Sequence, residues 1–145
     1  MPTRPVSEVI RNKPAVTLES HTTVREAARM MKSHHTSAVL VVNQKKMLVG
    51  ICTERDIVTE VVAKGMDANH TQVGEVMTDH PRTVHGETPF GHALHLMYEG
   101  GFRHVPVVDV AGRPIGILSA RDALGSDALE FGHDLERREE ITVIL

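Results

Sequence analysis

Gly116-Ile117-Leu118-Ser119-Ala120-Arg121-Asp122 follows the same plan as the earlier stretch Gly50-Ile51-Cys52-Thr53-Glu54-Arg55-Asp56. Each copy has a glycine, apolar residues typical of a strand, a hydroxyl residue, and then Arg-Asp. A hydroxyl at the end of a strand, with an aspartate one turn into a following helix, suits a polyhydroxylated ligand. The aspartate can accept two hydrogen bonds from a ribose diol, and the arginine beside it can bind a phosphate.

The two halves of the chain also match outside these signatures. Residues 6–10 open the first half and residues 73–77 open the second, and a proline follows each, Pro14 and Pro81. A short strand is predicted next in each half, over 15–17 and 82–84. The sequence therefore contains an internal repeat.

Helical spacing follows in both halves. Apolar residues recur at positions i, i+3, i+4 and i+7, as Val24, Ala27, Ala28 and Met31 and again as Phe90, Ala93, Leu94 and Met97. Thr22 or Thr23 is the expected N-cap of the first helix. Thr88 before Pro89 is the expected cap of the second, which Gly100-Gly101 should end.

Two more strands and a helix complete each half. Strands are predicted over 38–42 and 47–52, and again over 104–108 and 115–118, with short polar links that suit hairpins. A helix should start at each signature, with apolar stripes of Ile57, Val58, Val61 and Val62 and of Ala123, Leu124, Ala128 and Leu129. Each repeat is therefore strand-helix-strand-strand-helix.

The predicted fold class is α+β. Repeat 1 spans 6–65, repeat 2 spans 73–130, and residues 65–72 connect them. Because a unit of about 60 residues buries too little surface alone, the two copies should pack into one body. The tail, 131–145, ends in an apolar, β-prone segment suited to a dimer or edge contact.

Composition excludes several classes of function. Lys+Arg 16 against Asp+Glu 19 gives a net charge of −3, and only four residues are aromatic, so nucleic-acid binding is not expected. No apolar run has the length of a signal-peptide core or a membrane span. The lone Cys52 lies in an apolar strand, which excludes an internal disulfide and fits a reducing compartment. A cytoplasmic protein without membrane contact is expected.

No catalytic machinery is visible in the sequence. Cys52 has no cationic neighbour in its strand, and neither a phosphate-binding loop nor a dinucleotide glycine fingerprint is present. The protein is therefore expected not to be an enzyme, with no catalytic residues and no catalytic cofactor.

The repeat resembles a tandem pair of cystathionine-β-synthase (CBS) domains, a Bateman module, over residues 6 to 130. The two signatures carry this resemblance, together with the strand region Phe102-Arg103-His104-Val105-Pro106-Val107-Val108-Asp109. The resemblance implies two repeats related by a pseudo-two-fold axis, with facing sheets and two related clefts. It also implies a regulatory sensor for adenosine ligands (AMP first, then ATP or ADP, NAD and S-adenosylmethionine), usually a homodimer that acts on an effector protein not identified by the sequence.

The resemblance also assigns ligand-binding residues. Asp56 and Asp122 would each bind a ribose diol, with Thr53 and Ser119 beside them. The partner repeat would supply the base-binding wall, through Val16, Thr17, Ser37, Ala38 and Val39 in the Asp122 cleft and through Thr83, Val84, His104 and Val105 in the Asp56 cleft. Phosphate would be bound by Arg55, Arg121, Arg103 and His104.

The two repeats differ at one strand. The first has Ser37-Ala38-Val39-Leu40 where the second has Arg103-His104-Val105-Pro106. The first repeat therefore lacks a basic pair there, and the two clefts are expected to be unequal.

Other interpretations of the same residues remain open. Asp56 and Asp122 could be acids favoured at helix N-termini, Thr53 and Ser119 could be N-caps, and both signature arginines could be solvated. The module could be a structural dimerisation unit without ligand. The ten histidines raise the alternative of a metal-binding protein, but His92 and His95 have no third ligand nearby in sequence, and no metal site is expected.

Overall fold

The computed structural model describes residues 3–124. Its first repeat contains α1 (Val6–Val9), β1 (Thr17–Glu19), α2 (Val24–Ser33), β2 (Ala38–Val42), β3 (Leu48–Thr53), α3 (Glu54–Ile57) and the π-helix η1 (Val58–Val62). Its second contains α4 (Val73–Val76), β4 (Thr78–Asp79), α5 (Phe90–Gly100), β5 (His104–Val108), β6 (Pro114–Ser119) and the 3₁₀-helix η2 (Ala120–Leu124). The predictions for Ala128, Leu129 and the 131–145 tail lie outside the described residues.

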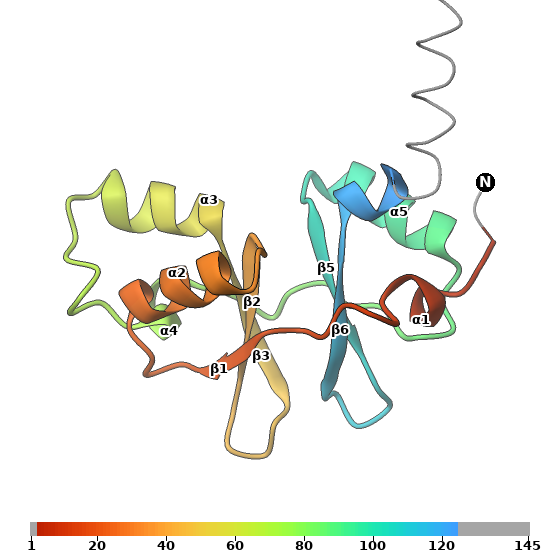
Figure 1. Ribbon diagram of the computed structural model, residues 1–145, viewed down its shortest axis with the longest axis horizontal. Coiled ribbons are helices and arrows are strands. Elements are labelled where there is room, and N and C mark those ends of the chain that lie inside the picture. Colours follow the sequence, from red (N-terminus) through yellow and green to blue (C-terminus); the bar gives the residue numbers. More distant parts are fainter. Residues whose placement is uncertain (1–2, 125–145) are drawn as a thin grey trace, which may run out of the picture.

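The strands form two sheets that lie side by side (Figure 1). The first has the order β1-β2-β3-β4, with β1 parallel to β2 and the other pairs antiparallel. The second is the β5-β6 hairpin. The strand predicted over 82–84 is reduced to one parallel bridge between Val84 and Val107, so the second sheet has only a one-residue counterpart of β1.

The helix caps agree with the sequence in the first repeat and differ in the second. Thr23 caps α2, and its hydroxyl accepts a hydrogen bond from the Glu26 amide at 3.2 Å. The prediction for Thr88 is wrong, because Pro89 occupies the N-cap position and the Thr88 hydroxyl accepts from the His85 amide instead. Gly101 ends α5 with a φ of 71°, a left-handed conformation that glycine adopts readily.

The apolar stripe predicted after the first signature is split between two faces. The chain changes from α3 to the π-helix η1, in which the Ala63 amide donates to the Val58 carbonyl. This i→i+5 bonding widens the turn. Val61 is buried in the core, whereas Val58 and Val62 are 57% and 69% exposed.

The short helix that opens each repeat packs against the other repeat. α1 lies beside α5, and α4 lies beside the first sheet (Figure 1). Val6 is buried in the second repeat's core and its amide donates to the Thr88 carbonyl at 2.8 Å. Val73 is buried in the first repeat's core and its amide donates to the Thr22 carbonyl at 2.7 Å. This reciprocal exchange ties the two repeats into one body.

The same exchange explains the glycine in each signature. A side chain at Gly50 would meet Met77, and a Cβ at Gly116 would lie 3.0 Å from the Cβ of Ile10. Met77 and Ile10 follow the two exchanged helices at equivalent positions. Glycine is needed at both places because a residue from the other repeat's opening segment packs against the strand backbone.

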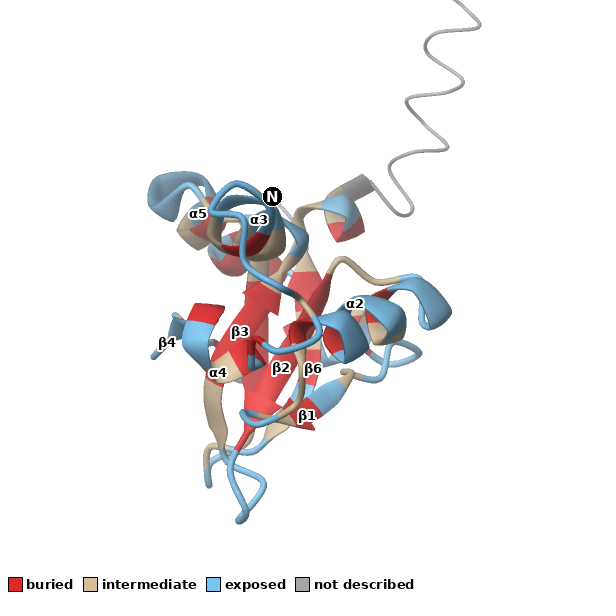
Figure 2. Ribbon diagram, turned by 90° about the vertical axis from the view of Figure 1, so that its left-hand side faces the viewer, coloured by how far each residue is buried: buried red, intermediate tan, exposed pale blue. Residues whose placement is uncertain are grey.

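Residues on the central strands alternate between two environments. Val39 and Val41 of β2 pack with the helices of the first repeat. Ala38 and Leu40 face the other way and pack near Ile117 of the second repeat's β6. The buried residues accordingly concentrate on the central strands (Figure 2). Facing sheets thus share a small apolar layer that brings the signature ends of β3 and β6 close together.

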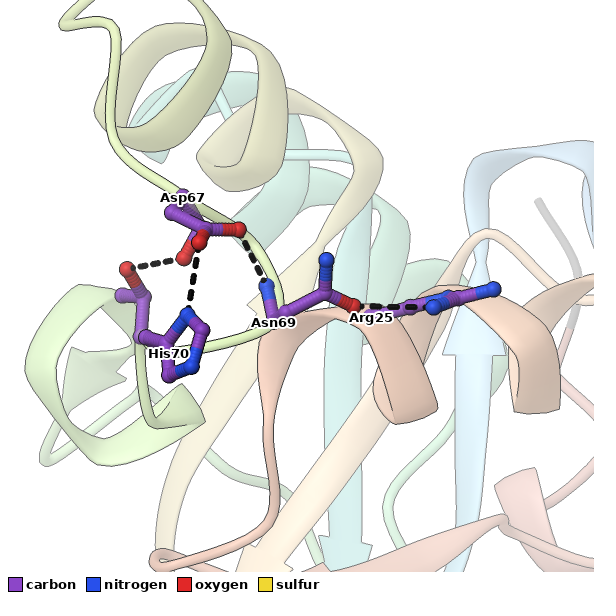
Figure 3. Close-up of polar contacts among 5 residues, drawn as sticks. Arg25, Asp67, Asn69 and His70 are labelled. Carbon is purple, nitrogen blue, oxygen red and sulfur yellow. Dashed lines mark hydrogen bonds and ion pairs between the residues drawn. The ribbon is translucent and has the colours of Figure 1, made fainter.

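Polar contacts order the connector between the repeats. Asp67 accepts a hydrogen bond from the Asn69 amide at 2.9 Å, and its other carboxylate oxygen lies 2.6 Å from His70 Nδ1 (Figure 3). The His70 hydrogen bond, with that from Asn69, lowers the pKa of Asp67. The Asn69 side chain accepts from Arg25 of α2 at 3.0 Å, which attaches the connector to the first repeat.

No helix within residues 3–124 combines the length and apolar character needed to cross a membrane.

Candidate functional site

A cleft of about 900 Å³ receives both signature segments. Five parts of the chain line it: Ser37 just before β2, the end of β3 with α3, residues within 78–82, residues 102–104, and the end of β6 with the start of η2. The lining residues are Ser37, Ile51, Thr53, Glu54, Arg55, Asp56, Thr78, His80, Pro81, Arg82, Phe102, Arg103, His104, Ser119, Ala120 and Arg121. The cleft is thus shared by the two repeats.

Asp56 is held in place by a capping box at the start of α3. The Thr53 hydroxyl accepts a hydrogen bond from the Asp56 amide at 3.2 Å, and Asp56 Oδ2 accepts from the Thr53 amide at 2.9 Å. These reciprocal bonds satisfy two backbone donors that the helix start would leave unpaired. Thr53 is therefore the N-cap of α3. The capping box uses only Oδ2 of Asp56, so Oδ1 is available to other hydrogen-bond donors.

That second oxygen has little competition from the protein. The Thr78 hydroxyl donates to Asp56 Oδ1 at 3.5 Å, the outer limit of a hydrogen bond. Thr78 lies on β4, which the second repeat contributes to the first sheet. Asp56 is half-buried, so its carboxylate can accept hydrogen bonds from a ligand in the cleft.

Asp122 has a different environment. Its side chain is 4% exposed, Oδ2 accepts from the Ser119 amide at 2.7 Å, and Oδ1 forms an ion pair with Lys13 Nζ. Asp122 does not line the cleft, although Ser119 and Arg121 do. The two signature aspartates are therefore equivalent in sequence and unequal in structure.

The cleft is rich in positive charge. Arg55, Arg82, Arg103 and Arg121 line it, against the carboxylates of Glu54 and Asp56. The whole chain carries a net charge of −3, so this excess of cations is local. Guanidinium groups form bidentate hydrogen bonds with phosphate, which makes the cleft suited to an anionic ligand.

A second side-chain hydrogen bond joins the two repeats inside the cleft, and it is shorter than the one between Thr78 and Asp56. Ser37 Oγ lies 2.7 Å from His104 Nε2. Burial, reinforced by Arg103, lowers the pKa of His104, and the carboxylates of Glu54 and Asp56 oppose that effect. A neutral imidazole is thereby favoured at this position.

The structure brings only some of the predicted ligand-binding residues together. Those that line the cleft are Ser37, Thr53, Arg55, Asp56, Arg103, His104, Ser119 and Arg121. Those that do not line it are Asp122, Val16, Thr17, Ala38, Val39, Thr83, Val84 and Val105. Val39, Val84 and Val105 are buried in the cores between strands and helices, and Ala38 is buried in the apolar layer between the sheets, where their apolar side chains are most stable.

Sequence reasoning missed the wall formed by Thr78, His80, Pro81 and Arg82, and it also missed Phe102. It assigned this part of the cleft to Thr83 and Val84, just beyond Arg82. A signal for the stretch that lines the cleft is present in the repeat, because Pro81 matches Pro14 and each proline follows an opening helix.

The environment of Cys52 disfavours its reactive thiolate form, and the histidines of the described residues do not gather into a metal site. Burial, with the nearby Asp56 charge, raises the pKa of the Cys52 thiol to about 12, so it stays protonated near neutral pH. Within residues 3–124 no three His, Cys, Asp or Glu side chains come together as metal ligands would.

Comparison with known proteins identifies the repeats. The CBS domain family matches residues 6–63 and again 73–128. An uncharacterised 17.7 kDa protein of Acidianus ambivalens is 33% identical, over 96% of this chain and 85% of its own length. The Arabidopsis thaliana CBS domain-containing protein CBSCBSPB1 is 37% identical over 79% of this chain, which spans only 21% of that protein's length.

Two solved structures share the fold. A CBS domain protein of Pyrobaculum aerophilum, PAE2072, complexed with AMP, has a TM-score of 0.75 and 29% identity, covering 81% of this chain and 88% of its own. The CBS domain pair of protein MJ0100, in complex with 5′-methylthioadenosine and S-adenosyl-L-methionine, has a TM-score of 0.77 and 29% identity, covering 92% and 99%. With two matched repeats and this shared architecture, the chain belongs to the CBS domain family as a tandem CBS pair.

Proposed function

We propose that the cleft binds an adenosine-containing nucleotide and that the protein is a regulatory sensor for it. The observation that carries this proposal is Asp56, a half-buried carboxylate with one weakly engaged oxygen in a cleft of about 900 Å³. Such a group can accept both hydrogen bonds of a ribose diol. A cleft of this volume lies in the range of small-molecule sites, which is about 300–1,000 Å³.

The charge of the cleft favours a ligand that carries phosphate. Arg55, Arg82, Arg103 and Arg121 offer charge-assisted hydrogen bonds to phosphate oxygens and would repel a sulfonium group. Phe102 and Ile51 provide apolar surface for a base. AMP is therefore the first choice, followed by ATP or ADP and NAD, with S-adenosylmethionine less favoured. The complexes of the similar structures with AMP and with S-adenosyl-L-methionine support this class of ligand.

The proposed mechanism is a population shift. The cleft is lined by Thr53 to Asp56 from one repeat and by Arg103 and His104 from the other, so a bound nucleotide would bridge the two repeats. It would favour the arrangement of repeats that it binds best. This regulatory role needs no catalytic residue, and the effector protein would detect the change in arrangement.

The outer face of the first repeat suits self-association. Val58, Val62 and Met66 are exposed there, at 57%, 69% and 39%. Exposed apolar residues grouped on one face mark interaction surfaces, and most soluble oligomers are symmetric. We therefore infer a homodimer. Sedimentation should show a dimer that Val62→Asp converts to monomer, and a wild-type monomer at all concentrations would contradict it.

Calorimetry and thermal shift with AMP, ADP, ATP, NAD, S-adenosylmethionine and Zn²⁺ test the function directly. A ligand at about 100 times its Kd should add about 2.7 kcal/mol of stability. Asp56→Asn keeps an oxygen that can cap α3 and removes the charge. It should therefore weaken nucleotide binding by about 1.5–3 kcal/mol. Glu99→Gln, an exposed residue of α5, is the matched control and should leave the affinity unchanged.

Three outcomes distinguish the candidate functions. Stabilisation by a nucleotide that Asp56→Asn weakens supports the sensor. Stabilisation by Zn²⁺ alone supports a metal-binding protein. A dimer that no ligand stabilises supports a structural dimerisation module, and the sensor proposal is then wrong.

A further inference from the structure

The two signature aspartates differ in the residue that contacts Oδ1 of the carboxylate. The weakly engaged oxygen of Asp56 lies 3.5 Å from a neutral hydroxyl, that of Thr78. The corresponding oxygen of Asp122 forms an ion pair with Lys13. The remaining oxygen of each aspartate has the same role, because it accepts a hydrogen bond from the amide of the signature hydroxyl residue. Besides the deeper burial of Asp122, the lysine is therefore what distinguishes the two sites.

Lys13 reaches Asp122 because of the exchange of opening helices. It belongs to the segment that runs from α1, which packs on the second repeat, to β1, which belongs to the first. Figure 1 shows this segment crossing from one repeat to the other. The equivalent residue in the second repeat is His80, since Pro14 and Pro81 follow them. The His80 side chain is 95% exposed and lies 3.5 Å from Asp79, so Asp56 keeps its access to the cleft.

The burial of Asp122 makes its ion pair with Lys13, whose side chain is half-exposed, difficult to displace. The Asp122 side chain is only 4% exposed. A buried carboxylate needs a counter-charge, and removing its partner leaves an uncompensated charge. A neutral ribose diol offers hydrogen bonds to Asp122 but no positive charge, so it competes poorly with the lysine ammonium.

We propose that Lys13 is a specificity-determining residue that closes the Asp122 site, so that each chain binds one nucleoside ligand, at Asp56. This inference rests on the proposed function for the type of ligand, and it adds which of the two equivalent sites is open. Arg121, which also lies near Lys13, remains available to the Asp56 cleft. The tandem repeat thus contains two signature aspartates and one working ribose site.

Calorimetry with AMP on the full chain tests the inference through stoichiometry. Wild type should bind one AMP per chain, Asp56→Asn should remove that binding, and Asp122→Asn should not. Lys13→Ala should bind a second AMP, with the affinity of the Asp122 site raised by at least about tenfold, the effect of one charge-assisted interaction. Adding Asp122→Asn to Lys13→Ala should abolish the second site.

Matched variants separate charge from folding. Lys13→Arg keeps the counter-charge and should keep one site, and Lys32→Ala, on the exposed face of α2, should also keep one. Circular dichroism and melting temperature report whether each variant folds. If Lys13→Ala fails to fold, Lys13→Gln, neutral and of similar length, takes its place and should also gain the second site.

Each outcome decides between the two ideas. The proposed role of Lys13 is wrong if wild type binds two AMP molecules per chain, or if it binds one and Asp122→Asn removes it. Either result leaves the proposed nucleotide sensor intact. The role of Lys13 is also wrong if Lys13→Ala or Lys13→Gln folds and still binds a single AMP. Weaker AMP binding by either variant contradicts it too, because Lys13 would then be a phosphate ligand. If wild type binds no AMP but Lys13→Ala binds one through Asp122, the proposed function fails and the closure by Lys13 stands. No binding by either protein rejects both.

Discussion

Ser37 of the first repeat and His104 of the second form a hydrogen bond across the cleft, with Ser37 Oγ 2.7 Å from His104 Nε2. The two residues lie just before β2 and at the start of β5. Both residues line the cleft that receives the signature segments, so a ligand bound there would lie beside a contact between the two repeats.

The lowered pKa of His104 predicts a dependence of stability on pH. The unfolded chain takes up a proton near the ordinary histidine value of about 6.5, whereas the folded state resists it because the imidazole is buried. The contribution of neutral His104 to the free energy of unfolding is therefore fully present above about pH 6.5, and it is lost as the pH falls below that value.

Thermal melts between pH 7.5 and 5 measure this effect. His104→Gln should lose less stability than wild type over that interval, whereas His92→Gln, an exposed residue of α5, should follow the wild-type curve. Parallel curves for wild type and His104→Gln would show that this histidine does not contribute.

Arg103→Ala should selectively weaken the binding of ligands that carry phosphate. Arg103 lines the cleft, so AMP or ATP would lose a charge-assisted hydrogen bond that adenosine does not form. We expect a loss in affinity of about tenfold or more for the nucleotides, little change for adenosine, and a flatter dependence of binding on salt. Calorimetry at two salt concentrations measures all three, with Arg29→Ala on α2 as the control. An equal loss for adenosine and ATP would contradict a role in phosphate binding.

The burial pattern of η1 predicts unequal effects on stability for substitutions at two adjacent valines. Val61 is 1% exposed in the first core, whereas Val62 is 69% exposed. Val61→Ala removes two buried methyl groups and should lower the free energy of unfolding by about 2 kcal/mol. Val62→Ala should change it by less than about 0.5 kcal/mol. Urea unfolding of both variants, at a concentration where each is in the same oligomeric state, provides the measurement. Equal effects would mean that η1 presents a different face to the core.

Gly116→Ala should destabilise the protein through the exchanged helix. Its new Cβ would lie 3.0 Å from the Cβ of Ile10, a residue of the second core, so Ile10 would have to shift from its packed position. We expect a loss of about 1–3 kcal/mol, typical of overpacking. Gly86→Ala is the matched control, because its nearest contact would be an ordinary 3.4 Å to Ser7. If Gly116→Ala unfolds at the same urea concentration as wild type, the close packing of Ile10 on this strand is not needed.

The sequence alone determined the local elements and the repeat. The predicted strands over 38–42 and 104–108 coincide with β2 and β5, and the predicted helices fall within α2 and α5. These elements were predictable because their apolar periods and their short links act over a few residues. The same local signals placed the hydroxyl and aspartate of the first signature at the start of a helix, where Thr53 and Asp56 form a capping box.

Only the tertiary structure decided which parts of the two repeats meet. No local pattern indicates that α1 packs on the second repeat, that Thr78 approaches Asp56, or that Lys13 forms an ion pair with Asp122. Asp56 and Asp122 have the same neighbours in sequence, Arg on one side and an apolar residue on the other. Their environments differ because each carboxylate faces a residue more than twenty positions away, and those contacts depend on how the whole chain buries its apolar surface.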